Sequence, residues 1–161
     1  QASRGQAGRG RTGRGLAQPG VELTVIAGTA YGKESPVRVL SPTLYVHAQL
    51  AAGASLVVDD QHNERAVYVA SGRLSLGEGG PEYGEGTLLV LPAGARVEIT
   101  SAAGARAMLL GGAPLAGARH IFWNFVSSSK ERLEKAKHDW QAGLFGKVVG
   151  DEHEFIPLPG T

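Results

Sequence analysis

Two glycine-framed segments constrain the fold of this chain more than any other feature. One of them has the pattern Gly-x5-Pro-x-Gly-x2-Val and runs from Gly86 to Val97. In its Leu91–Gly94 part, proline fixes φ at the second turn position and glycine suits the fourth, which is typical of a type I turn. After the turn, Val97 and Ile99 alternate with polar residues, as in a half-buried strand. The segment therefore predicts two strands joined by a tight turn, with Val97 facing the interior.

The other segment runs from Gly53 to Gly72 and has the pattern Gly-x5-Asp-x-Gln-x3-Arg-x6-Gly, with Asp59, Gln61 and Arg65 at the variable positions. Together the two segments resemble the two-part metal-site frame of cupin barrels, which carries three histidines and a glutamate at the four positions held here by Asp59, Gln61, Arg65 and Val97. The resemblance implies an all-β fold, the RmlC-like jelly-roll or double-stranded β-barrel of cupins.

The residue types at these four positions argue against a metal site. Zinc and iron sites of this kind use imidazole nitrogens and a carboxylate. Asp59 and Gln61 offer only oxygen and Val97 offers no donor, while the fixed positive charge of Arg65 repels a divalent cation. We therefore predict no metal, no other cofactor and no catalytic residue in this chain. We also hypothesise that Arg65 and Asp59 form an ion pair in place of the metal.

Composition agrees with one β-rich domain. Twenty-four glycines and eight prolines separate short apolar runs in a chain of 161 residues, which is typical of a sandwich or barrel. There is no cysteine, so disulfide and thiolate chemistry are excluded. Strands are predicted at residues 21–26, 37–40, 44–50, 55–58, 65–70, 73–76, 87–91, 95–100 and 105–110. Residues 78–81 and 102–104 are predicted to be hairpin turns.

One helix is predicted, near the end of the chain. Ser128 and Glu131 have the spacing of a capping box, in which the hydroxyl and the carboxylate satisfy the first free amides. Leu133, Ala136 and Trp140 follow on one helical face, and Gly143 is placed to end the helix. Trp140 is predicted to anchor this helix against the barrel wall.

Charge separates the first residues from the rest. Residues 1–20 hold four arginines and no acid, whereas the remaining chain has twelve Lys and Arg against fifteen Asp and Glu. We predict a disordered Arg/Gly-rich leader or linker at 1–19, a β-barrel at 20–126, and a C-terminal helix and tail at 127–161 that pack on the barrel. The leader lacks the aromatic residues that base stacking needs, so a nucleic-acid partner is not expected. The first residue is Gln1, which suggests a piece of a longer chain.

Several longer segments resemble the C-terminal half of bacterial pirins. They are Gly20–Gly28, Ser35–Val37, Ser41–Tyr45, His62–Asn63 with Tyr68–Val69, Trp123–Leu133, Asp139–Trp140 and Glu154–Pro159. The resemblance covers roughly residues 20–160. It implies one half of a two-barrel protein whose iron site, of three histidines and a glutamate, lies in an N-terminal barrel absent here. The family is associated with quercetin 2,3-dioxygenase activity in some members and with transcriptional co-regulation in others.

Four polar residues are candidates for a pocket or for a structural role: His47, His62, Asn63 and Tyr68. His47 shares a strand face with Tyr45 and Gln49, so it is predicted to lie on the polar face of its strand. His62 falls one residue outside the histidine register of the frame. It is predicted to order its loop through a hydrogen bond to Asn63 or to the main chain.

Three functions are compatible with these residues. The first, which we favour, is a structural cupin domain that packs against an N-terminal pirin cupin domain or forms a homo-oligomer, and is itself no enzyme. The second is part of an iron-dependent quercetinase-type dioxygenase whose catalytic barrel lies outside this chain. The third is a metal-free barrel that binds a small ligand. No apolar run is long enough for a membrane span, and we expect a cytoplasmic protein without membrane partners.

Overall fold

The computed structural model describes residues 18–160, which form two compact units, one up to Pro114 and one from Leu115. Most of the predicted leader therefore lies outside the described residues. The predicted barrel region extended to residue 126, whereas the structure places residues 115–126 in the second unit. The packing of the C-terminal helix and tail on the barrel stays a prediction.

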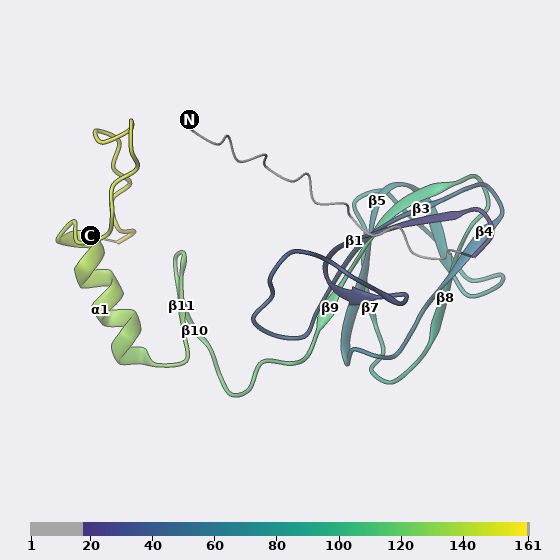
Figure 1. The fold of residues 1–161 in the computed structure, drawn as a ribbon, viewed down its shortest axis with the longest axis horizontal. Coiled ribbons are helices and arrows are strands. Elements are labelled where there is room, and N and C mark those ends of the chain that lie inside the picture. The colour runs from purple at the N-terminus through teal and green to yellow at the C-terminus, as the bar shows by residue number, and fades with distance from the viewer. Residues whose placement is uncertain (1–17, 161) are drawn as a thin grey trace, which may run out of the picture. The chain divides into compact units, whose positions relative to one another are not determined.

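The first unit is built from nine strands. Their bounds are β1 Val21–Ala30, β2 Lys33–Glu34, β3 Thr43–Leu50, β4 Ala54–Val58, β5 Glu64–Leu76, β6 Glu82–Gly84, β7 Leu88–Leu91, β8 Val97–Ser101 and β9 Ala105–Gly112. All pairings are antiparallel, in the order β2-β1-β3-β9-β5-β8-β4, with β6 and β7 also paired to β5. Figure 1 shows these strands curled around a common interior.

The long strand β5 joins the two layers of the barrel. Its first part pairs with β7, its last part pairs with β6 and β8, and β9 runs beside it between Glu64 and Gly72. A register shift between Val69 and Ser71 marks an irregularity at which the strand can bend. The layers are therefore β1-β3-β9-β5-β7 on one side and β4-β8-β5-β6 on the other.

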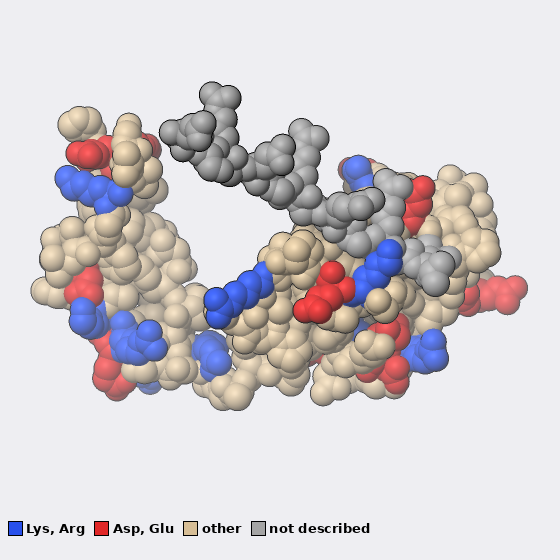
Figure 2. Space-filling view, viewed as in Figure 1, with Lys and Arg blue, Asp and Glu red and all other residues tan. Residues whose placement is uncertain are grey.

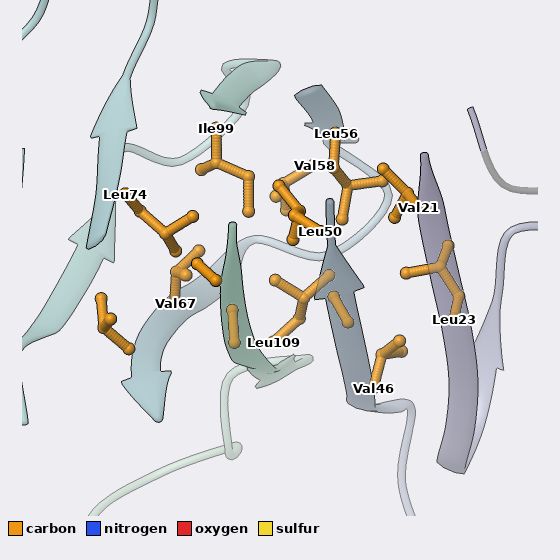
Figure 3. Packing of buried hydrophobic residues seen from close by; sticks show 14 of the residues in the cluster. Val21, Leu23, Val46, Leu50, Leu56, Val58, Val67, Leu74, Ile99 and Leu109 are labelled. Atoms are coloured by element: carbon orange, nitrogen blue, oxygen red, sulfur yellow. The ribbon is translucent and has the colours of Figure 1, made fainter. Parts of the chain in front are cut away.

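The core lies between these layers. Alternate residues of β3 are buried, and the same alternation recurs in β4, β7 and β9. Figure 3 shows the inward side chains meeting, among them Val46 and Leu50 of β3, Leu109 of β9 and Ile99 of β8. The observed burial follows the predicted alternation, so the predicted all-β barrel of two layers is confirmed.

Two of the predicted β features are wrong. Residues 37–40 form no strand, and Val37, Val39 and Leu40 are exposed in the segment before β3. Residues 102–104 do form a turn, but β8 and β9 do not pair with each other and lie in different layers. Neither difference could be read from local pattern, because the apolar run and the turn residues carry no information about which strand is the neighbour.

The glycines of the two frames have a backbone role. Gly53, Gly72, Gly86 and Gly94 have φ values of +75°, +78°, +84° and +68°. In this region a Cβ is strained against the main chain, so glycine is favoured whether or not a metal is bound nearby. The frame therefore marks strand connections, and its presence carries no information about metal binding.

The second unit contains the strands β10 (His120–Phe122) and β11 (Phe125–Ser127), which form a hairpin, and the helix α1 (Lys130–Gln141). The N-cap of α1 is Ser129, whose hydroxyl oxygen accepts a hydrogen bond from the Arg132 amide at 3.2 Å. The prediction of Ser128 as the cap was thus one residue early. Gly143, with φ of +66°, follows the C-cap residue Ala142 as predicted. Over the described range, no helix is long and apolar enough to cross a membrane.

Trp140 is the centre of an aromatic cluster in the second unit. Its ring lies 5.2–6.1 Å, centroid to centroid, from the rings of Trp123, Phe125, Phe145 and Phe155. Its indole nitrogen donates a hydrogen bond to the Ile156 carbonyl at 2.9 Å, which ties the last residues to the helix. Trp140 therefore packs within its own unit, as a structural anchor.

Candidate functional site

The four positions of the metal-site frame lie at one end of the barrel. Asp59 follows β4, Arg65 is the second residue of β5, and Val97 begins β8, where it pairs with Val58 of β4. Gln61 is exposed in the loop between β4 and β5, and its main-chain amide donates a hydrogen bond to the Asp59 carboxylate at 3.2 Å. Val97 is half-buried and packs against the hydrophobic core, as predicted from its strand pattern.

Arg65 is the most unusual residue of this site because its charged side chain is buried, with only 2% of the residue exposed. One terminal nitrogen, Nη1, donates to the main-chain carbonyl of Asp59, and the other, Nη2, donates to the Pro92 carbonyl at 2.6 Å. The Nε atom is buried without a hydrogen-bond partner. The guanidinium thus connects the loop after β4 to the turn after β7.

The predicted ion pair between Arg65 and Asp59 is not formed. Arg65 contacts the main chain of Asp59, and no salt bridge to a carboxylate is present for Arg65 in the described part of the chain. The sequence identified the correct partner residue but the wrong atom. Backbone carbonyls can satisfy a guanidinium because it is a planar group with five N–H donors.

This donor set does not fit a metal ion. The position of the glutamate ligand holds a buried cation, and a histidine position holds a valine that fills the interior. Among residues 18–160, no group of three or more His, Cys, Asp or Glu side chains is placed to hold a metal. A divalent cation would therefore meet a guanidinium where it needs a carboxylate.

The four polar candidates do not come together at this end of the barrel. His47 and Tyr68 lie on the outer face of the sheet, one on β3 and one on β5, with β9 between them. His62 and Asn63 lie in the β4–β5 loop. His62 makes no side-chain hydrogen bond within the described chain, so the predicted bond to Asn63 or the main chain is not formed. A pocket role for these residues stays a prediction.

Tyr31 is a residue of this end that the sequence analysis missed. It lies in the turn between β1 and β2 at φ of +53°, and its hydroxyl donates to the Val57 carbonyl at 3.1 Å. Burial, followed by the negative charge of Asp59, raises the pKa of Tyr31 above its ordinary value. An alternating apolar pattern cannot reveal such a residue, because it reaches the site from a turn.

Tyr31 lines a small cavity of about 210 Å3 together with other residues from both layers: Gln18, Leu23, Leu56, Val57, Asp59 and Arg96. Pockets for drug-sized ligands have volumes of about 300–1,000 Å3. The cavity is thus small for an organic substrate, which weakens the case for a ligand-binding barrel.

In Figure 2, basic and acidic side chains are interspersed over the visible face of the barrel unit.

The raised pKa of Tyr31 predicts a specific pH dependence of stability. The phenol contributes stability that is complete below the unfolded-state pKa of about 10 and is lost as the pH rises above it, since the unfolded chain ionises first. We expect Tyr31→Phe to be less stable than the wild type by about 1 kcal/mol at neutral pH, because the bond to Val57 is lost. The difference should shrink and reverse in alkali.

This prediction is checked by urea unfolding of both proteins over a series of pH values from neutral to strongly alkaline. The other three tyrosines are present in both proteins, so their ionisation cancels in the difference. A difference between wild type and Tyr31→Phe that stays constant across the series would contradict the prediction.

The architecture and the frame define the class of protein, a cupin barrel. The Pirin C-terminal cupin domain family matches residues 45–146. A "Pirin-like protein" of Caulobacter vibrioides is 44% identical over 140 residues, which are 87% of this chain and 48% of the relative. The chain belongs to the pirin family and is similar to the C-terminal cupin domain of its members.

Two further comparisons agree with this assignment. A Pseudomonas aeruginosa protein, whose name gives quercetin 2,3-dioxygenase as its proposed activity, is 31% identical over 146 residues, covering 88% of this chain and 46% of the relative. The crystal structure of a quercetin 2,3-dioxygenase from Acinetobacter baumannii superposes with a TM-score of 0.78 at 24% identity, over 89% of this chain and 49% of that one. This chain therefore spans about half the length of the curated relatives it matches.

Proposed function

We propose that this domain is a metal-free structural cupin that packs against a second barrel, either the N-terminal cupin domain of a longer pirin or a second copy of itself. The observation that carries the proposal is Arg65, whose buried guanidinium occupies the glutamate position and is bound by the carbonyls of Asp59 and Pro92. A group in this place serves as an internal tie between two loops.

The half-length match supports the same proposal. The curated relatives are about twice as long as the segment this chain matches. A domain that forms half of a longer protein needs a surface for the other half, which is a structural task that does not require a metal. We expect the chain alone to have no dioxygenase activity.

The first experiment is metal analysis by plasma mass spectrometry on tag-free protein dialysed without chelator. We expect well under about 0.1 equivalents of any transition metal, because two of the four frame positions lack a usable donor. A matched sample is incubated with one equivalent of iron, zinc or nickel and then desalted, and it should return to the same low value. Near one equivalent of bound metal would overturn the proposal, and Asp59 and His62, which lie at the frame end of the barrel, would then be the first residues to substitute.

A second candidate function concerns the longer protein. The proposed quercetin 2,3-dioxygenase activity in the name of the Pseudomonas relative favours an iron-dependent dioxygenase as the parent, with its chemistry in a barrel outside this chain. The test compares quercetin consumption, with added iron, by this chain and by a full-length parent. Turnover by the full-length protein alone supports this candidate, whereas turnover by this chain would contradict the assignment of the chemistry to the other barrel.

A further inference from the structure

The outer face of the layer containing β3, β9, β5 and β7 carries apolar side chains where a solvent-facing sheet normally carries polar ones. Along each of these strands they alternate with buried core residues, so they lie on the opposite face of the sheet. The outer-sheet patch, as we define it, consists of Tyr45, His47, Ala66, Tyr68, Leu88, Val90, Met108 and Leu110. Tyr68, Leu88 and Val90 are 38%, 53% and 78% exposed.

Strand register places the patch in two continuous rows. One row crosses the strands through Tyr45, Leu110, Ala66 and Val90. The neighbouring row crosses them through His47, Met108, Tyr68 and Leu88. Because residues directly opposite on paired strands lie about 5 Å apart, the eight side chains form one contiguous surface. Contiguous apolar surfaces on soluble proteins usually mark an interface.

Charged residues of opposite sign flank the patch at its two ends along the strand direction. At one end the next row contains Arg106, beside Gln49, with Glu22 one strand further away. At the other end the next row contains Glu64, beside Gly112. Arg106 and Glu64 are exposed, and neither forms an ion pair in the described part of the chain.

This arrangement is self-complementary. A two-fold axis that lies in the plane of the patch, perpendicular to the strands, lays the patch on its own copy and exchanges the two strand ends. Arg106 of one protomer then lies beside Glu64 of the partner subunit, and the pair occurs twice. No Lys, Arg, Asp or Glu lies within the patch, so the two copies meet without like-charge repulsion.

We propose that the outer-sheet patch is the interface of a symmetric dimer of this chain, packed sheet against sheet, with Arg106 and the partner's Glu64 at both ends. The proposal rests on the proposed structural function and names its partner as a second copy. The uncharged centre and the opposite charges of Arg106 and Glu64 at the two ends favour a copy over an unrelated partner, because the two-fold operation brings Arg106 of each protomer beside Glu64 of the other.

The test is sedimentation velocity of the chain at micromolar concentrations. We expect a dimer in the wild type and a monomer in the double variant Leu88→Lys/Val90→Lys, which places charges in the patch at exposed positions. The matched control Val37→Lys/Leu40→Lys adds the same charges to exposed apolar positions before β3 and should remain dimeric. Far-UV circular dichroism confirms that both variants fold.

A charge exchange tests the orientation. Arg106→Glu and Glu64→Arg should each weaken the dimer by about tenfold, because each puts like charges together twice per dimer. The combined variant Arg106→Glu/Glu64→Arg should restore the wild-type affinity. A monomeric wild type, a dimer that survives the patch substitutions, or a combined variant weaker than both single variants would each overturn the proposal.

These outcomes are separable from failure of the proposed function. A dimer that uses another face removes this interface and leaves the structural role intact. Bound metal in the same samples, measured by mass spectrometry, contradicts the proposed function whatever the oligomeric state.

Discussion

Replacing Gly28 by alanine is expected to lower the free energy of unfolding of the barrel by about 3 kcal/mol or more. Gly28 lies in β1 opposite Leu44 of β3 and has φ of +79°. A Cβ at this position would lie 1.7 Å from the main-chain carbonyl oxygen of Thr43, so β1 and β3 would have to separate. The loss combines backbone strain with a clash against main chain that no side-chain rotation can relieve.

Gly32→Ala provides the matched control. Gly32 has a similar φ of +71°, but no atom lies within 4 Å of an added Cβ. We expect a loss of about 1 kcal/mol, from backbone strain alone. Urea unfolding should be followed by far-UV circular dichroism, because both tryptophans, Trp123 and Trp140, lie in the second unit. Equal losses for the two variants would show that the close approach to Thr43 is not important.

Replacing Arg65 by glutamate is expected to be the most damaging substitution at the site. The variant places a carboxylate in a buried position. The neighbouring carbonyls of Asp59 and Pro92 are acceptors and cannot donate a hydrogen bond to it. An uncompensated buried charge costs about 3–5 kcal/mol. Arg65→Met keeps much of the volume and removes the charge, so its loss should be nearer 1–2 kcal/mol, from the two hydrogen bonds.

The two variants should also differ in their response to pH. Burial raises the pKa of a glutamate at this position above the unfolded value of about 4.3. Its destabilising effect is therefore absent at pH values below the unfolded pKa and grows as the pH rises. The stability gap between Arg65→Glu and Arg65→Met should close as the pH falls from 7 to 4. A gap independent of pH would indicate that the carboxylate reaches solvent.

Much of the architecture could be predicted from the sequence. Alternating apolar residues predicted β3 and β4, and the turn residues predicted the connection between β7 and β8, because both signals are local. The helix was predicted for the same reason, and only its N-cap was misplaced, since Ser127, Ser128 and Ser129 offer three hydroxyls in succession. The hairpin of β10 and β11 was missed because each of its strands has only three residues.

The site could be predicted only in part. Residue types alone showed that Arg65 and Val97 do not suit a metal, because a fixed cation and an alkyl group have no ligand chemistry in any conformation. The atom that receives the Arg65 guanidinium could not be predicted, since main-chain carbonyls are present at every residue and only the path of the loops brings those of Asp59 and Pro92 to it. The contact of Tyr31 with the Val57 carbonyl could not be predicted for the same reason.

Most strands of the barrel, the turn geometry of the two frames and the chemical unsuitability of the frame for a metal follow from the sequence alone. These properties depend on residue type, on spacing along the chain and on local backbone preference. Only the three-dimensional fold shows which strands are neighbours and what surrounds Arg65. It also brings the outward-facing residues of β3, β9, β5 and β7 together in one apolar patch. Those properties depend on contacts between residues far apart in sequence, which only the register between strands establishes.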